Sequence, residues 1–279
     1  MRTERIVAIS FLTLVFILGI VNYTTHLTPE HREIHTVDGL VQSKVVNPSS
    51  PDDILPITDK VKPILYTEVG FMEELPHDEI KEKFIDIMLP AILVAKYELA
   101  YQQEQVRYLS ENHQWSNNDS LFIQTLFDTY DTSDLDDLHM RLETHPSSIV
   151  LAQAAIETGW GKSRFFREAN NVFGIWSYDP NEPRIPAAVS REDYRAYLKK
   201  FETISASIKG YFMTIAKANA YSDFRAARME TQNVDELTAH LVNYSEMREE
   251  YVEQLNAMIR INKFKKYDKY TIDPLFINR

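Results

Sequence analysis

The longest apolar stretch of the chain lies near its beginning. Residues 6–21 carry no charge, and Arg2 and Arg5 precede them. This length approaches the roughly 20 residues with which a helix crosses a bilayer, and basic residues before such a run favour a cytoplasmic N-terminus. No A-x-A-like cleavage site follows. The pattern predicts an uncleaved signal anchor over residues 1–23, single-pass in the cell membrane, with the rest of the chain on the outer or periplasmic side.

Residues 24–75 show neither helical nor alternating periodicity. Prolines recur in "NPSSPDDILP" and "DKVKP", and such composition favours an irregular linker. The pattern predicts a flexible tether over residues 24–75 and a folded domain over residues 76–279. His31 and His35 stand four apart but outside an H-E-x-x-H pattern, so they do not indicate a metal site. We expect no metal and no cofactor.

Beyond the tether, apolar residues follow a helical period. In residues 77–110, Ile80, Phe84 and Ile92 stand on one face, and Pro90 predicts a kink. The same spacing recurs at Ile204, Ile208, Phe212 and Ile215, and at Tyr251, Leu255 and Met258. Residues 175–202 differ, because prolines and short apolar runs there indicate a small hairpin or a long ordered loop. The fold class predicted is mainly α with a small β-hairpin.

Composition removes several classes of function. The chain has 30 basic and 41 acidic residues, for a net charge of −11, and no cysteine. Nucleic acid is not expected as a partner, because phosphate binding needs a basic face. The absence of cysteine excludes disulfides, thiolate zinc sites and a cysteine nucleophile.

The triplet Gly161-Lys162-Ser163 resembles the end of a phosphate-binding loop. The full pattern G-x-x-x-x-G-K-[ST] requires glycine at position 156, where this chain has Ile156. The preceding "SSIVLAQAAIE" is also rich in helix formers, whereas the loop follows a strand. We therefore expect no nucleotide.

The same segment carries a candidate acid, Glu157. Ser147 or Ser148 is a plausible start of a helix, and Gly159 favours a helix end in the left-handed backbone conformation. Glu157 would then lie in the last helical turn, where unpaired carbonyls and burial both favour the protonated carboxyl. A carboxylic acid held neutral is what general acid catalysis requires. The alternative is an ordinary surface glutamate at a frayed helix end.

The residues around Glu157 carry a family resemblance. "VLAQAAIETGWGKSRFFREANNVFGIW" resembles the signature of family 73 of the glycoside hydrolases, the endo-β-N-acetylglucosaminidases. A looser resemblance continues in "FETISASIKGYF" and "YSEMREEYVEQLNAMI". Together with "FIDIMLPAILVA", the chain from about residue 77 to its end is most similar to the Bax-type subgroup. The resemblance implies a lysozyme-like domain in which two helical lobes and a β-hairpin enclose a groove.

The resemblance also implies roles for single residues. Glu157 falls on the catalytic acid and Tyr244 on the tyrosine that faces the scissile bond, while Tyr251 matches a later tyrosine that either binds substrate or is structural. Gly159, Trp160 and Gly161 fall on the turn after the helix, and Asn171, Phe173 and Gly174 on the motif behind the cleft.

A second carboxylate is less well defined. The family places one on the hairpin, where Glu192 is preferred over Asp193, Glu182 and Asp179. Its distance from the acid would separate a covalent nucleophile from a base that activates water. In a third route the N-acetyl group of the substrate attacks, and no second carboxylate is needed.

Aromatic side chains favour a sugar-binding groove, because flat rings with polar edges suit sugar faces. The aromatic residues near the motif are Trp160, Trp176, Tyr178, Tyr194 and Tyr197. Trp160, Trp176, Tyr178 and Tyr251 are the candidates for substrate contact, and for Trp160 and Phe173 a purely structural role in the core is also open.

The resemblance implies a hydrolase that cleaves β-1,4 N-acetylglucosaminyl bonds of peptidoglycan or a related glycan. Its partners would be that GlcNAc-containing glycan and the membrane, through residues 6–21. A non-catalytic glycan-binding or envelope scaffold protein with the same fold is the alternative, and an anchored helical adaptor is a third.

Overall fold

The computed structural model describes residues 39–112, 114–187 and 196–278. The predicted signal anchor over residues 1–23 lies outside these ranges. Within them, no helix combines the length and the apolar character needed to span a membrane.

Most of the described chain is helical, as the sequence predicts. The α-helices are α2 (His77–Glu111), α3 (Asn117–Tyr130), α4 (Leu135–Leu142), α5 (Ser147–Thr158), α6 (Arg164–Ala169), α7 (Ile204–Lys217), α8 (Ser222–Glu230), α9 (Val234–Ala239) and α10 (Glu249–Ile261). The strands are β1 (Lys44–Val46), β2 (Lys60–Val61), β3 (Ile64–Tyr66), β4 (Arg184–Pro186), β5 (Tyr197–Lys199) and β6 (Thr271–Ile272). Short 3-10 helices are η1 (Pro51–Asp53), η2 (Phe71–Glu74), η3 (Asn219–Tyr221), η4 (Phe264–Lys269) and η5 (Pro274–Phe276).

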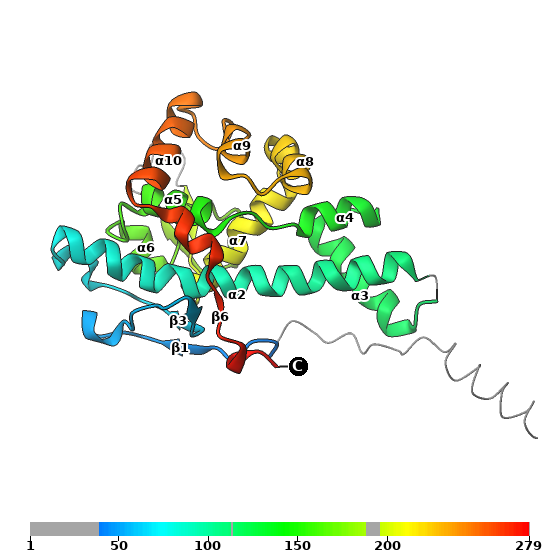
Figure 1. Ribbon diagram of the computed structural model, residues 1–279, viewed down its shortest axis with the longest axis horizontal. Helices are drawn as coiled ribbons and strands as arrows, with labels where there is room; N and C mark the ends of the chain where they lie inside the picture. Colours follow the sequence, from blue (N-terminus) through cyan, green and yellow to red (C-terminus); the bar gives the residue numbers. More distant parts are fainter. Residues whose placement is uncertain (1–38, 113, 188–195, 279) are drawn as a thin grey trace, which may run out of the picture. The chain divides into compact units, whose positions relative to one another are not determined.

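Helix α2 is the central element of the fold. Every residue from Phe84 to Ala95 is buried, and all of them except Asp86 are apolar, as expected of a helix surrounded by protein. The helices α5 and α7 lie on one side of α2 and the strands β1 and β3 on the other (Figure 1). The predicted helix over residues 77–110 is confirmed, and it continues through Pro90.

Residues 39–75 form an ordered layer, so the prediction of a flexible tether is wrong for them. Strand β1 pairs in parallel with β3, and β2 pairs in parallel with β6 near the end of the chain. Val61, Tyr66 and Met72 are buried in the core. These strands are two or three residues long, which is too short for an alternating pattern to emerge from the sequence.

An antiparallel pair of strands is present where the sequence predicts a hairpin. Strand β4 pairs with β5 so that Ile185 lies opposite Leu198. Trp176 forms a further antiparallel bridge with Leu198. The described residues from position 39 onward belong to one compact unit, and the predicted division into two lysozyme-like lobes stays a prediction.

Candidate active site

Glu157 lies in the last turn of α5, a helix whose other residues are nearly all buried. Gly159 ends the helix in the left-handed conformation, with φ 56°, as its position in the sequence predicts. The side chain of Glu157 is accessible to solvent and lies on the wall of a pocket of about 390 Å³. The helix end therefore presents the carboxyl to a concave surface.

Two effects act on the Glu157 carboxyl. Burial raises its pKa above the usual value, because protein atoms around the carboxyl replace water that would solvate the charge. The hydroxyl of Tyr251 lies 3.4 Å from Oε1 of Glu157, and this hydrogen bond lowers the pKa. Burial is the larger effect, so the protonated form is favoured relative to a free glutamate.

A chain of buried hydrogen bonds leads to this carboxyl. Gln153 donates through Nε2 to the hydroxyl of Tyr251, at 3.2 Å. The hydroxyl of Tyr211 donates to Oε1 of Gln153, at 2.6 Å. Nε2 of His145 lies 2.8 Å from that same Tyr211 hydroxyl. Each of these four side chains is at most 2% exposed, so the chain is shielded from bulk water.

The donors in this chain all point the same way. A tyrosine hydroxyl has one hydrogen, and Tyr211 gives it to Gln153, so Nε2 of His145 must be the donor to Tyr211. The other ring nitrogen of His145 has no hydrogen-bond partner among the described residues, and burial lowers the pKa of His145 well below its usual value. A neutral histidine thus begins a series of donors that ends at Oε1 of Glu157.

The pocket beside Glu157 is lined largely by aromatic rings. Phe173, Trp176, Tyr178 and Tyr244 belong to its wall. Trp176 is 50% exposed and Tyr178 is 82% exposed, so both rings offer free faces. The Tyr244 ring stacks on Tyr251, with centroids 5.2 Å apart and planes at 17°. The structure therefore brings the predicted residues Glu157, Trp176, Tyr178 and Tyr244 together.

Asn171 holds the pocket segment against the hairpin. Its side-chain amide donates to the carbonyl oxygens of Ile175 and Lys199, and its oxygen accepts from the Ile175 amide. Gly174 follows with φ 63°, a conformation that favours glycine, and it lines the pocket itself. The motif residues thus shape the wall of the cavity.

The hairpin acids do not join Glu157 within the described chain. Glu182 forms an ion pair with Lys199, at 2.9 Å, and Oδ1 of Asp179 accepts from the Asn181 amide. Neither side chain lines the pocket. The preferred second carboxylate, Glu192, lies outside the described residues, as does its neighbour Asp193.

Trp160 lies apart from the pocket. Its ring packs edge-on against Phe84, with centroids 5.6 Å apart, and against Phe264, at 6.0 Å. This places Trp160 with the core, which is the structural role that the sequence left open. Tyr251 is also buried and does not line the pocket, so its contact is with Glu157.

Three residues near Glu157 were not singled out from the sequence. Gln153 and Tyr211 belong to the hydrogen-bond chain, and Tyr221 lines the pocket. Gln153 precedes Glu157 by four residues, so a helix places both on one face. That spacing was the available signal, whereas the tyrosines come from distant segments.

Comparisons with known proteins agree with the resemblance found in the sequence. Residues 136–264 match the family model described as mannosyl-glycoprotein endo-beta-N-acetylglucosaminidase. Protein bax of Escherichia coli (strain K12) is 31% identical over 129 residues, which span 44% of this chain and 45% of that protein. The chain thus matches less than half the length of this relative.

Solved structures also match. The catalytic domain of the autolysin Auto from Listeria monocytogenes is 19% identical with a TM-score of 0.38, covering 60% of this chain and 96% of that one. A glycoside hydrolase domain of FlgJ from Salmonella typhimurium is 20% identical with a TM-score of 0.37, covering 50% and 97%.

The family match includes the segment that carries Glu157, Gly159 and Asn171. The predicted resemblance to family 73 and to its Bax-type subgroup is confirmed. Over residues 136–264, this chain is similar to the glucosaminidase domains of family 73 of the glycoside hydrolases.

Proposed function

We propose that this protein hydrolyses β-1,4 N-acetylglucosaminyl bonds of peptidoglycan or a related glycan, with Glu157 as the general acid. The observation that carries the proposal is the position of Glu157, at a helix end, in an aromatic pocket, with its pKa raised by burial. A general acid must hold its proton until the leaving oxygen needs it. The raised pKa of Glu157 supports this role.

The hydrogen bond from Tyr251 assigns different tasks to the two oxygens of the carboxyl. Oε1 accepts from the Tyr251 hydroxyl, so the acidic proton belongs on Oε2. Oε2 transfers this proton to the glycosidic oxygen as the bond from that oxygen to the sugar carbon breaks. The departing sugar leaves as an alcohol, Glu157 becomes a carboxylate, and positive charge develops on the remaining ring.

The aromatic wall would bind the sugar chain. Trp176 and Tyr178 present free ring faces beside Glu157, and such rings stack on the apolar faces of sugars. Tyr244 stays neutral, because burial raises its pKa well above the usual value. Its hydroxyl can therefore donate to the substrate near the bond that breaks, which is the role that we propose for it.

A second group must stabilise or capture the sugar cation. We propose Glu192 for this task, on the segment between β4 and β5. If Glu192 attacks the sugar directly, the anomeric configuration is retained, and the carboxyls of Glu192 and Glu157 should lie about 5 Å apart. If Glu192 is instead a base that activates water, the configuration is inverted, and the two carboxyls should lie about 6.5–9.5 Å apart. Proton NMR of the first product anomer distinguishes the two. A Glu192→Gln variant with full activity would favour attack by the substrate's N-acetyl group.

We also propose that residues 6–21 anchor the protein in the cell membrane, with the compact unit from residue 39 onward on the outer or periplasmic side. The support is the uncharged run behind Arg2 and Arg5. Fractionation of cells that express the full chain tests this proposal, since release into the soluble fraction without detergent would contradict it.

The direct test is release of soluble fragments from purified peptidoglycan. Glu157→Gln keeps the shape of the side chain and removes its acidic proton, so the rate should fall by about 10² to 10⁴. Glu253→Gln removes an exposed carboxyl on α10 and should leave the rate unchanged. A glycan-binding protein without catalysis would release nothing in any of the three forms, and equal rates for wild type and Glu157→Gln would refute the assignment.

A further inference from the structure

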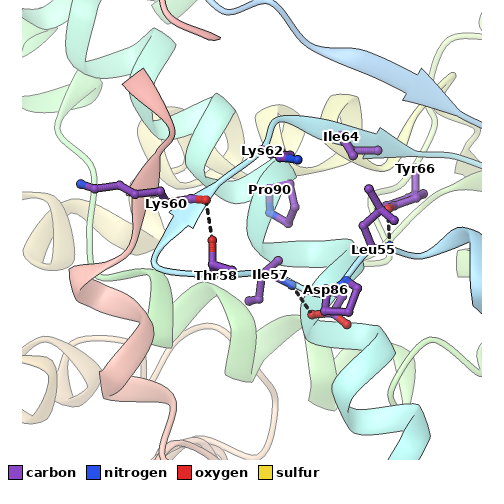
Figure 2. A pocket seen from close by; sticks show the side chains of 10 residues that line it. Leu55, Ile57, Thr58, Lys60, Lys62, Ile64, Tyr66, Asp86 and Pro90 are labelled. Atoms are coloured by element: carbon purple, nitrogen blue, oxygen red, sulfur yellow. Dashed lines mark hydrogen bonds between the residues drawn. The ribbon is translucent and has the colours of Figure 1, made fainter. Parts of the chain in front are cut away.

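A second cavity lies on the opposite side of α2 from α5 and the Glu157 pocket. It has a volume of about 260 Å³ and is lined by residues of β2, β3, α2 and the segment before β2. Figure 2 shows Asp86 and Pro90 of α2 among the lining side chains, with Asp86 beside Ile57. The reaction proposed above uses none of these residues.

Asp86 is the acidic group of this cavity. Its side chain is 9% exposed, and Oδ1 accepts a hydrogen bond from the Ile57 amide, at 3.1 Å (Figure 2). Burial raises its pKa to about 6. In the part of the chain that the structure describes, no cation lies within ion-pair distance of Asp86, and the nearby Lys83 donates to the Ile54 carbonyl oxygen, at 3.1 Å. Oδ2 is therefore left to accept from a ligand.

Pro90 lies one helical turn after Asp86, and its ring is part of the cavity wall. The acceptor that the cavity offers is the free oxygen of the Asp86 carboxylate. A buried carboxylate favours a ligand with several hydrogen-bond donors and a positive charge, and a primary ammonium has both.

The remaining walls define the rest of the ligand. Leu55, Ile57 and Ile64 supply apolar surface, which suits methylene groups. Lys60 and Lys62 also line the cavity, but the Lys60 ammonium donates to Thr271, at 3.1 Å. Among described residues, no acidic side chain pairs with Lys62, which is exposed. A ligand that is only cationic would be repelled there, whereas a carboxylate would be attracted.

We propose that this cavity binds an aliphatic ω-amino acid, with its ammonium group on Asp86 and its carboxylate beside Lys62. The volume lies just below the roughly 300 Å³ at which typical small-molecule pockets begin, so the ligand is the size of one amino acid. It is either a free amino acid or the last residue of a peptide with an amine in its side chain. This binding is independent of glycan hydrolysis.

The experiment is an NMR titration of the whole protein that follows the amides of Ile57 and Ile64. The main probe is 6-aminohexanoate, which has both charged groups on an aliphatic chain. Hexanoate lacks the ammonium and pentylamine lacks the carboxylate, so both should bind more weakly. Free lysine and Nα-acetyl-lysine then separate the two sources, because the acetylated form reproduces the end of a peptide.

Three variants test the assignment of the charges. Asp86→Asn keeps an acceptor for Ile57 but removes the charge, so affinity for 6-aminohexanoate should fall about tenfold or more. Lys62→Gln should weaken the binding of 6-aminohexanoate, whereas the binding of pentylamine should stay unchanged or become slightly tighter. Asp78→Asn, an exposed carboxyl at the start of α2, is the matched control and should bind as wild type does.

The result that overturns the proposal is equal affinity in wild type and Asp86→Asn, or hexanoate that binds as tightly as 6-aminohexanoate. If Asp86→Asn does not fold, the Lys62→Gln variant decides instead, since Lys62 is exposed. Unchanged affinity for 6-aminohexanoate in Lys62→Gln, with no preference of the wild type for the ammonium probes, then refutes the site.

Discussion

The hydroxyl of Tyr251, on α10, donates to Oε1 of Glu157, on α5, across 3.4 Å. This contact joins two helices that pack against each other, and it connects the pocket acid to the buried chain that begins at His145. Because every donor in the chain points toward Glu157, the orientation of the Tyr251 hydroxyl is fixed by buried groups. Under the proposed mechanism, the chain therefore leaves Oε2 of Glu157 free for the substrate.

Tyr251→Phe removes the last donor of the chain. The hydrogen bond lowers the pKa of Glu157 and burial raises it, so without the bond the pKa should rise further. A general acid is inactive once it has lost its proton, and the decline of activity at high pH should therefore move to higher pH. The rate should also fall, because Oε1 is no longer held. A profile of kcat/KM against pH checks this.

Tyr270→Phe is a suitable comparison, since Tyr270 lies after η4 and packs on Tyr267. It should reproduce the wild-type profile. If the activity of Tyr251→Phe declines at the same high pH as that of wild type, the hydrogen bond from Tyr251 does not change the pKa of Glu157.

Gln153→Met tests the middle of the chain. Methionine has a similar volume but cannot donate to Tyr251 or accept well from Tyr211, so two buried hydroxyls lose a partner. Each unsatisfied buried group costs about 1–3 kcal/mol of folding stability. Urea unfolding measures the loss, and the same preparation should show reduced kcat. Gln254→Met, at an exposed position of α10, should change neither quantity, and equal stability of the two variants would contradict a structural role for Gln153.

The sequence predicted the local part of this site better than its distant part. Glu157 and Gly159 follow from one helix and its stop, and Asn171 and Gly174 from the motif just after it. Tyr211 reaches Gln153 across 58 positions in the chain, and no local pattern contains such a contact. The layer of residues 39–75 escaped prediction for the same reason, because β2 pairs with β6 at the far end of the chain.

Asp86→Asn should change how stability depends on pH. The folded state raises the pKa of Asp86 from 3.8 to about 6, so it holds the proton more tightly than the unfolded chain does. Stability is therefore lost as pH rises from about 4 to about 6. With 1.36 kcal/mol for each pKa unit, this loss is about 3 kcal/mol at most. Removing the group should flatten the pH dependence in this window.

Urea unfolding at pH 4, 5, 6 and 7 provides the measurement. Asp78→Asn should keep the wild-type slope, because Asp78 is exposed. If Asp86→Asn shows the wild-type slope as well, Asp86 is ionised in the folded protein at acidic pH and its burial has no energetic consequence.

Trp176 and Trp160 should respond to alanine substitution in opposite ways. Trp176 is half exposed on the pocket wall, so Trp176→Ala should leave the folding stability nearly unchanged. Loss of the Trp176 ring should weaken the binding of a chitooligosaccharide by about 0.5–1.5 kcal/mol, which is the contribution of one aromatic contact, and KM should rise accordingly. Trp160 packs between Phe84 and Phe264, and its replacement should cost up to about 3–5 kcal/mol of stability, as for other aromatic residues of a core. Thermal unfolding and calorimetric titration of both variants separate the roles. A Trp160→Ala protein that unfolds like wild type but binds sugar poorly would reverse the assignment and place the sugar chain on the α5–α6 turn instead.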